Sequence, residues 1–89
     1  MSGFKFYRGI VIEPDPDRRA RFRVVADASP RFNSIESVAQ TTQAIEILNS
    51  TPVDVVFIGE LGGAAVQLFI KRARESEAGR LAAYVFLKQ

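Results

Sequence analysis

Three acidic side chains are the residues of this sequence best suited to chemistry. Glu13 and Asp15 follow an apolar run, Ile10–Ile12, and Glu60 follows a second run that ends at Ile58. If both runs are parallel strands, their carboxyl ends meet at the edge where open α/β sheets bind ligands. Carboxylate oxygens are the ligands that a hard cation such as Mg²⁺ prefers. The functional interpretation is therefore a residual cation site.

A simpler interpretation of these residues needs no ligand. Asp15 stands directly before Pro16, so its side chain can cap a helix that begins with proline. The carboxylates of Glu13 and Glu60 are then ordinary solvated groups. We favour this interpretation because Pro14 offers no side-chain oxygen at the centre of the acidic group.

Other kinds of site are excluded or weakly supported. The 89 residues contain no cysteine and no histidine, which excludes Ser-His and Cys-His nucleophile pairs and zinc sites of imidazole or thiolate. Gly59 and Gly62-Gly63 lack the spacing and the lysine-hydroxyl pair of a phosphate-binding loop. An arginine-rich segment could face nucleic acid or an acidic protein, but a solvated helix face is the usual meaning of such a run, and a net charge of +2 is too small to argue for nucleic acid. Its members are Arg18, Arg19, Arg21 and Arg23.

The elements that would hold these residues alternate along the chain. Apolar runs predict strands, and prolines, glycines and capping residues mark the ends of helices. The predicted strands cover 8–13, 32–39, 53–58 and 82–87, and the predicted helices cover 16–28, a segment from Thr41 or Thr42 to Leu48, and a segment beyond Gly62-Gly63 that ends near Gly79. With right-handed crossovers, this order predicts one α/β domain over 1–89, in which a parallel sheet has helices on both faces.

The predicted helices and the second predicted strand contribute side chains to the expected core. The helix stripes and the strand pattern select Phe22, Val25, Ala26, Ile35, Val38, Ala44, Ile45, Leu48, Val66, Phe69, Ile70 and Ala73. No apolar run is long enough to span a bilayer, and the first residues are not a signal peptide because charges interrupt them. We therefore expect a cytoplasmic protein.

Four short segments, in this order and spacing, resemble a known family. They are Ile10-Val11-Ile12-Glu13-Pro14-Asp15-Pro16, Ala39–Leu48, Pro52-Val53-Asp54-Val55-Val56-Phe57-Ile58 and Ala83-Tyr84-Val85-Phe86-Leu87. Together they resemble the receiver domains of bacterial response regulators, from the first strand and its acidic turn to the fourth strand. The resemblance implies a flavodoxin-like sheet with strand order 2-1-3-4 that lacks the last strand and helices of a full receiver.

Of the four positions of the family's phosphorylation site that can be matched, three are changed, and the acidic residue Glu13 is kept. The aspartate that accepts the phosphoryl group matches Gly59, which has no side chain and cannot act as a nucleophile. The two acidic residues that hold Mg²⁺ match Glu13 and Pro14, and the Ser or Thr after the fourth strand matches Lys88. The family's fifth strand, with its lysine, does not follow. We expect Lys88 to neutralise the acidic edge beside Glu13 or Glu60.

These departures imply a degenerate receiver, or pseudo-receiver, that works by protein-protein contact and independently of phosphorylation. We expect no enzymatic activity, no cofactor and no metal. The alternative is a regulatory module that binds a small ligand or a nucleotide in the emptied acidic pocket near Gly59.

The fourth predicted strand is a candidate interaction surface. Tyr84, Val85, Phe86 and Leu87 make it apolar on both faces, and neither proline nor an inward charge interrupts it. An edge strand of this kind favours pairing with another chain. We expect a homodimer through this strand, or a signalling partner that covers it.

Overall fold

The computed structural model describes residues 7–87, without the side chain of Asn33. Strands and helices alternate, except for two consecutive helices before the last strand. They are β1 (Tyr7–Ile12), α1 (Pro16–Asp27), β2 (Phe32–Val38), α2 (Thr41–Ser50), β3 (Val55–Ile58), α3 (Gly63–Ala73), α4 (Glu77–Leu81) and β4 (Ala83–Phe86). Each strand begins and ends within two residues of its predicted range.

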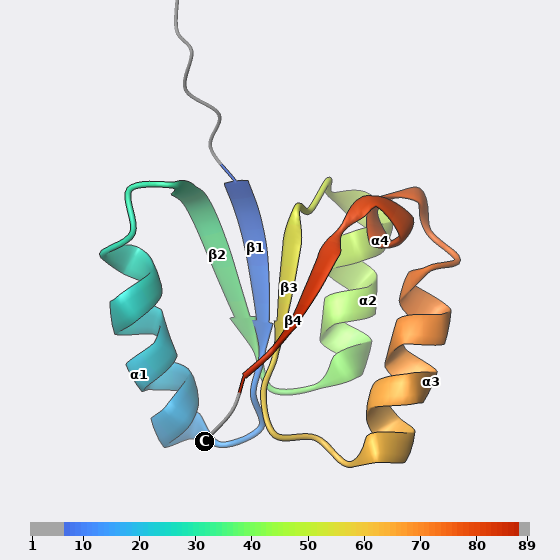
Figure 1. The fold of residues 1–89 in the computed structure, drawn as a ribbon, viewed down its shortest axis with the longest axis horizontal. Coiled ribbons are helices and arrows are strands. Elements are labelled where there is room, and N and C mark those ends of the chain that lie inside the picture. The colour runs from blue at the N-terminus through green and yellow to red at the C-terminus, as the bar shows by residue number, and fades with distance from the viewer. Residues whose placement is uncertain (1–6, 88–89) are drawn as a thin grey trace, which may run out of the picture.

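The strands form one parallel sheet in the order β2-β1-β3-β4 (Figure 1). In its register, Val11 of β1 stands opposite Phe57 of β3, which stands opposite Val85 of β4. The α/β class, the parallel pairing and the strand order are confirmed. The arrangement is that of a flavodoxin-like sheet, here with four strands.

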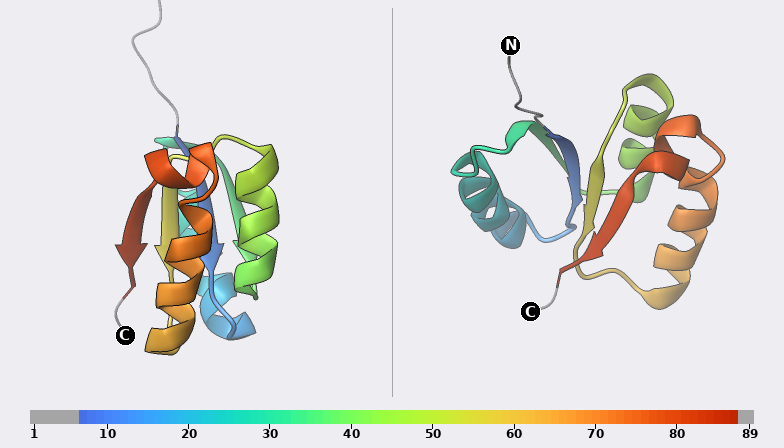
Figure 2. Two further views of the ribbon diagram at one scale, coloured as in Figure 1. Left: turned by 90° about the vertical axis from the view of Figure 1, so that its right-hand side faces the viewer. Right: turned by 45° about the horizontal axis from the view of Figure 1, so that its top comes forward.

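Helices cover the two faces of the sheet unequally (Figure 2). The larger core lies on the face of α2, α3 and α4, and it contains Ile10, Ile12, Val56 and Ile58 of the two central strands. A smaller core around Val11 lies on the opposite face, where α1 is the covering helix among the described elements. Among residues 7–87, no helix has the length and apolar character that a membrane span requires.

Helix α1 contacts the sheet through a narrower stripe than predicted. Phe22 packs against Phe57 with ring centroids 5.1 Å apart, and Ala26 is buried. The predicted core position of Val25 is wrong, because its side chain is 70% exposed. Each residue advances about 100° around a helix of 3.6 residues per turn, so Val25 cannot share the inward direction of Ala26.

The third predicted helix is two helices. α3 ends at Ala73, and Ser76 then caps α4: its hydroxyl accepts from the Gly79 amide at 3.0 Å and donates to the Ala73 carbonyl at 2.9 Å. We predicted that Gly79 lies near the end of a single third helix. It lies inside α4 instead. Its carbonyl accepts a hydrogen bond of 2.6 Å from the Tyr84 hydroxyl, which ties α4 to β4.

Candidate functional site

The candidate site lies at the carboxyl ends of the two central strands. Beyond the end of β3, the Gly59 amide donates to the Ile12 carbonyl at 2.8 Å. Beyond the end of β1, the Glu13 amide donates to the Val38 carbonyl at 3.0 Å. These backbone bonds fix Glu13 and Gly59 side by side, as the sequence predicts for a parallel sheet.

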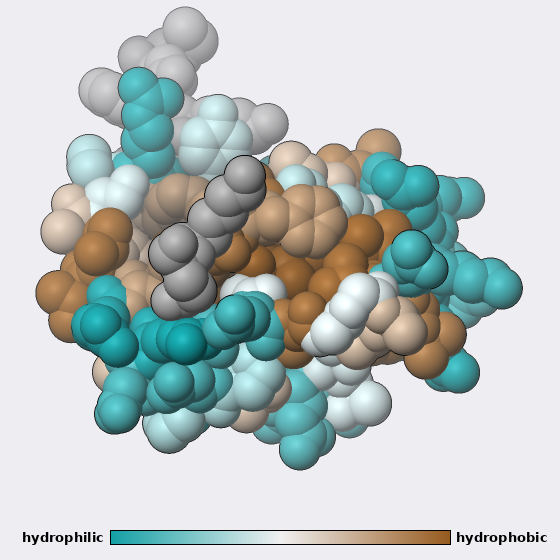
Figure 3. All heavy atoms as spheres, turned by 60° about the horizontal axis from the view of Figure 1, so that its bottom comes forward, coloured by the Kyte–Doolittle hydropathy of each residue, from teal (hydrophilic) through white to brown (hydrophobic). Residues whose placement is uncertain are grey.

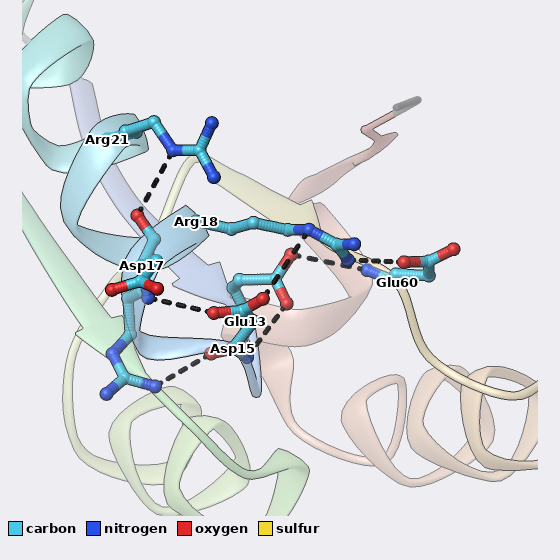
Figure 4. Close-up of polar contacts among 7 residues, drawn as sticks. Glu13, Asp15, Asp17, Arg18, Arg21 and Glu60 are labelled. Atoms are coloured by element: carbon cyan, nitrogen blue, oxygen red, sulfur yellow. Dashed lines mark hydrogen bonds and ion pairs between the residues drawn. The ribbon is translucent and has the colours of Figure 1, made fainter.

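Glu13 is buried, although we expected a solvated carboxylate. Its side chain turns inward at the edge of the sheet, and the residue is only 3% exposed. Its Oε2 accepts from the Asp15 amide at 3.0 Å, and its Oε1 accepts from the Glu60 amide at 3.5 Å (Figure 4). The carboxylate thus bridges the loop after β1 and the loop after β3. The backbone donors offset the loss of water around its charge.

The carboxylate of Glu13 occupies the space that a side chain at position 59 would enter. A Cβ atom built on Gly59 would lie 2.3 Å from Oε1 of Glu13 and 2.9 Å from the carbonyl oxygen of Ile12. Glycine is needed here for space and not for conformation, because no described glycine has a positive φ. Any side chain at position 59 would require Glu13 to move.

The turn after Glu13 has the predicted helix start. Asp15 caps α1, and its Oδ1 accepts from the Asp17 amide at 2.9 Å. Pro14 is exposed and contributes no side-chain oxygen. Arg19 donates from its guanidinium to the Glu13 carbonyl at 2.8 Å, which holds the start of α1 against the end of β1.

Arg18 supplies the positive charge of the site. Its guanidinium donates to the carboxylate of Glu60 and lies 3.7 Å from the Asp15 carboxylate. Figure 4 shows Arg18 reaching from α1 toward the loop that holds Glu60. The hydrogen bond to Glu60 raises the pKa of Arg18 above its ordinary value, with smaller contributions from the charges of Glu60, Asp15 and Glu13.

From the sequence we predicted this role for Lys88, which stays a prediction, and we did not predict it for Arg18. Lys88 lies outside the described residues. The sequence did hold one signal for Arg18, its position three residues after the capping Asp15, which places both on one side of the first helical turn. No local pattern predicted that Arg18 would pair with Glu60, because the two residues are 42 positions apart along the chain.

The described residues of the site offer no hydroxyl, thiol or imidazole nucleophile. The side chains of the site are carboxylates, the guanidinium groups of Arg18 and Arg19, and a proline, and Gly59 offers no nucleophile. Within residues 7–87, no three His, Cys, Asp or Glu side chains gather closely enough to hold a metal ion. Among the described residues, the guanidinium of Arg18 pairs with two of these carboxylates, and the guanidinium of Arg19 donates to the Glu13 carbonyl.

The arginines of α1 are engaged locally as well. Arg23 pairs with Asp27 one turn later at 3.2 Å, and Arg21 donates to the backbone carbonyl of Asp17. Exposed i,i+4 pairs of this kind belong to a solvated helix face.

The predicted interaction edge, Tyr84–Leu87, lies on the last strand of the described sheet. β4 pairs with β3 on one side. Val85 is 39% exposed and Phe86 is 55% exposed, while Tyr84 and Leu87 are half-buried. Tyr84 packs edge-on against Phe69 of α3. The edge is therefore apolar and partly open to water.

No protein-family model matches this chain, and no curated protein or solved structure matches it either. The receiver resemblance rests on the four sequence segments, and the strand order agrees with it.

Proposed function

We propose that this protein is a non-phosphorylatable pseudo-receiver, a protein-protein interaction module of bacterial two-component-type signalling. It works in the cytoplasm without enzymatic activity or a cofactor. Its partners recognise a conformation that is fixed by the protein itself rather than by phosphorylation.

The observation that carries this proposal is the contact between Glu13 and Gly59. In a receiver, the end of the third strand presents a carboxylate to a phosphoryl donor. Here the matching position has no side chain, and the carboxylate of Glu13 fills the space with its oxygens bonded to two backbone amides. Phosphoryl transfer therefore has no nucleophile at position 59. The loops after β1 and β3 are already connected by the hydrogen bonds of the Glu13 carboxylate.

The charge arrangement supports the same proposal. Arg18 lies between Asp15 and Glu60, where it neutralises the acidic edge from within the chain. Because the guanidinium of Arg18 already pairs with both carboxylates, their negative charge needs no divalent cation to balance it. The carboxylates of Asp15 and Glu60 are thus paired within the chain, without phosphate or metal.

The alternative, a ligand-binding or nucleotide-binding module, is less well supported. A buried carboxylate next to Gly59 repels an anionic phosphate and takes up the room that a ligand would need. A thermal-shift screen with nucleotides tests this alternative, because a ligand of the folded state must raise the melting temperature.

Phosphoryl transfer tests the proposal directly. The protein is incubated with acetyl phosphate or phosphoramidate and Mg²⁺, and its intact mass is measured beside that of an active receiver. We expect the active receiver to gain one phosphoryl group and this protein to keep its mass. A stoichiometric gain that hydroxylamine removes would reveal an acyl phosphate and overturn the proposal.

A further inference from the structure

Within residues 7–87, no strand pairs with the outer edge of β4, and the direction of its backbone groups is known. The Ala83 amide donates to the carbonyl of Asp54, the residue just before β3, at 2.8 Å. The Leu87 amide donates to the carbonyl of Ile58, the last residue of β3, also at 2.8 Å. Backbone groups of successive residues point to opposite sides of a strand. Those of Tyr84 and Phe86 therefore point away from β3, to a side on which residues 7–87 provide no further strand.

The side chains of this edge are apolar, and part of their surface is open. Val55, Phe57 and Val85 share the sheet face that α1 covers only in part, and Val85 is 39% exposed. Phe86 is 55% exposed on the opposite face. On the side of the molecule drawn in Figure 3, hydrophobic residues gather across the middle and hydrophilic residues border them.

The opposite edge of the same sheet is different. β2 carries the exposed residues Ser34 and Glu36, and a charge on an edge strand discourages pairing with another chain. No charged residue lies between Ala82 and Leu87 of the other edge. Two β4 edges can therefore approach each other without like charges in contact, whereas β4 and β2 are poorly matched.

We propose that β4 pairs antiparallel with β4 of a second copy of this chain, about a two-fold axis at Val85. In this register Tyr84 stands opposite Phe86 of the second copy, and Ala83 stands opposite Leu87. Tyr84 and Phe86 are the residues whose backbone groups point outward, so each such pair exchanges both N–H···O bonds. Val85 meets its own equivalent in the non-hydrogen-bonded position on the axis.

The side-chain directions agree with this register. Tyr84 and Phe86 both stand beside residues of the larger core, Val56 and Ile58, and so point to the α3 face. A two-fold axis perpendicular to the sheet keeps that face common to both copies, so the Phe86 side chain meets Tyr84 across the junction. The result is a closed two-fold dimer with one continuous sheet, in which the β4 edges of the two copies pair with each other.

A second copy of the chain is thus the partner of the interaction module proposed above. The pairing itself is argued from β4, and only its role in signalling rests on that proposal. Its test is separate from the phosphorylation test. If the protein is monomeric and takes no phosphoryl group, the self-pairing is wrong and the pseudo-receiver proposal stands.

The oligomeric state is measured first, by light scattering after size-exclusion chromatography over a range of micromolar concentrations. We expect a dimer that Val85→Lys converts to a monomer, because two ammonium groups would face each other on the axis. Val24→Lys is the matched control, since Val24 is exposed on α1 away from this edge, and it should leave the dimer intact. A wild-type monomer throughout the range overturns the proposal.

Cysteine cross-linking tests the register and does not depend on the folding of a lysine variant. The protein contains no cysteine, so each introduced thiol reports alone. Non-hydrogen-bonded antiparallel pairs have Cα atoms roughly 4.5 Å apart, within the range that a disulfide can bridge. Val85→Cys should form a disulfide-linked dimer under mild oxidation, while Ala83→Cys and Val24→Cys should not. Equal cross-linking of Ala83→Cys, or none of Val85→Cys, would contradict the pairing about Val85.

Discussion

Oε1 of Glu13 lies 2.3 Å from the point where a Cβ atom of residue 59 would begin. The two residues are separated by 46 positions in the sequence, and the pairing of β1 with β3 brings them together. Position 59 has no side chain, and the carboxylate that lies beside it comes from the end of the first strand. This carboxylate accepts hydrogen bonds from the backbone amides of Asp15 and Glu60.

The first prediction concerns Gly59→Ala. The added methyl group meets the Glu13 carboxylate and the Ile12 carbonyl, so we expect a loss of about 1–3 kcal/mol in the free energy of unfolding, as for other overpacked sites. Urea denaturation measures it. Gly63→Ala is the control: apart from its chain neighbours and the backbone of its own helix, no atom lies within 4 Å of its added Cβ, so it should be neutral or slightly stabilising. Equal effects of the two substitutions would show that position 59 is not crowded.

The second prediction concerns Gly79→Ala in α4. A Cβ atom there would lie 1.7 Å from the Ala73 carbonyl oxygen, which is backbone and cannot rotate away. We expect Gly79→Ala to lower the melting temperature more than Gly59→Ala does, and to weaken the attachment of α4 to Tyr84. A melting temperature close to that of the wild type would refute this account of the α3–α4 turn.

The third prediction concerns Tyr84 and pH. Burial raises the pKa of Tyr84, and the nearby charge of Arg74 opposes this. Because the folded state holds the phenolic proton more tightly, the stability from this group is complete below the ordinary tyrosine pKa of about 10 and is lost as pH rises above it. Tyr84→Phe should cost about 0.5–1.5 kcal/mol at neutral pH through the lost hydrogen bond to Gly79.

The measurement for Tyr84 is chemical denaturation at neutral and alkaline pH. Tyr84→Phe should lose less stability between the two than the wild type does. If the wild type and the variant lose the same amount, Tyr84 makes no contribution to the alkaline destabilisation.

The fourth prediction concerns Mg²⁺. Pro14 supplies no ligand, and Arg18 already lies between Asp15 and Glu60, so millimolar Mg²⁺ should not raise the melting temperature beyond an ionic-strength-matched sodium salt. Arg18→Ala leaves these carboxylates unneutralised, and its melting temperature should respond more to Mg²⁺. Arg23→Ala removes an exposed ion pair on the same helix and should not respond. A specific rise in the wild type would mean that Arg18 does not take the place of the cation.

The sequence predicted the fold well because its signals are local and agree with one another. The capping Asp15 before Pro16, the strand at Val55–Ile58 and the α3 stripe through Phe69 and Ala73 each depend on residues close together in the chain. The error at Val25 arose because α1 alternates arginines with apolar residues, which leaves no clear stripe to choose its inward direction.

The site was predicted less well because its contacts are tertiary. That Gly59 and Glu13 would be neighbours followed from the parallel sheet, but the inward turn of the Glu13 side chain depends on amides in two separate loops. The pairing of Arg18 with Glu60 depends on how α1 sits against β3. Neither contact leaves a pattern of spacing in the sequence.

The central claim is that Glu13 occupies the place of a side chain at position 59. A double-mutant cycle tests it most directly, with the free energies of unfolding of the wild type, Glu13→Ala, Gly59→Ala and the double variant measured by urea denaturation. We predict that the methyl group at position 59 costs less stability once the carboxylate is gone, with a coupling of about 0.5–3 kcal/mol between the two sites. Additive effects, within about 0.3–0.5 kcal/mol, would contradict the claim.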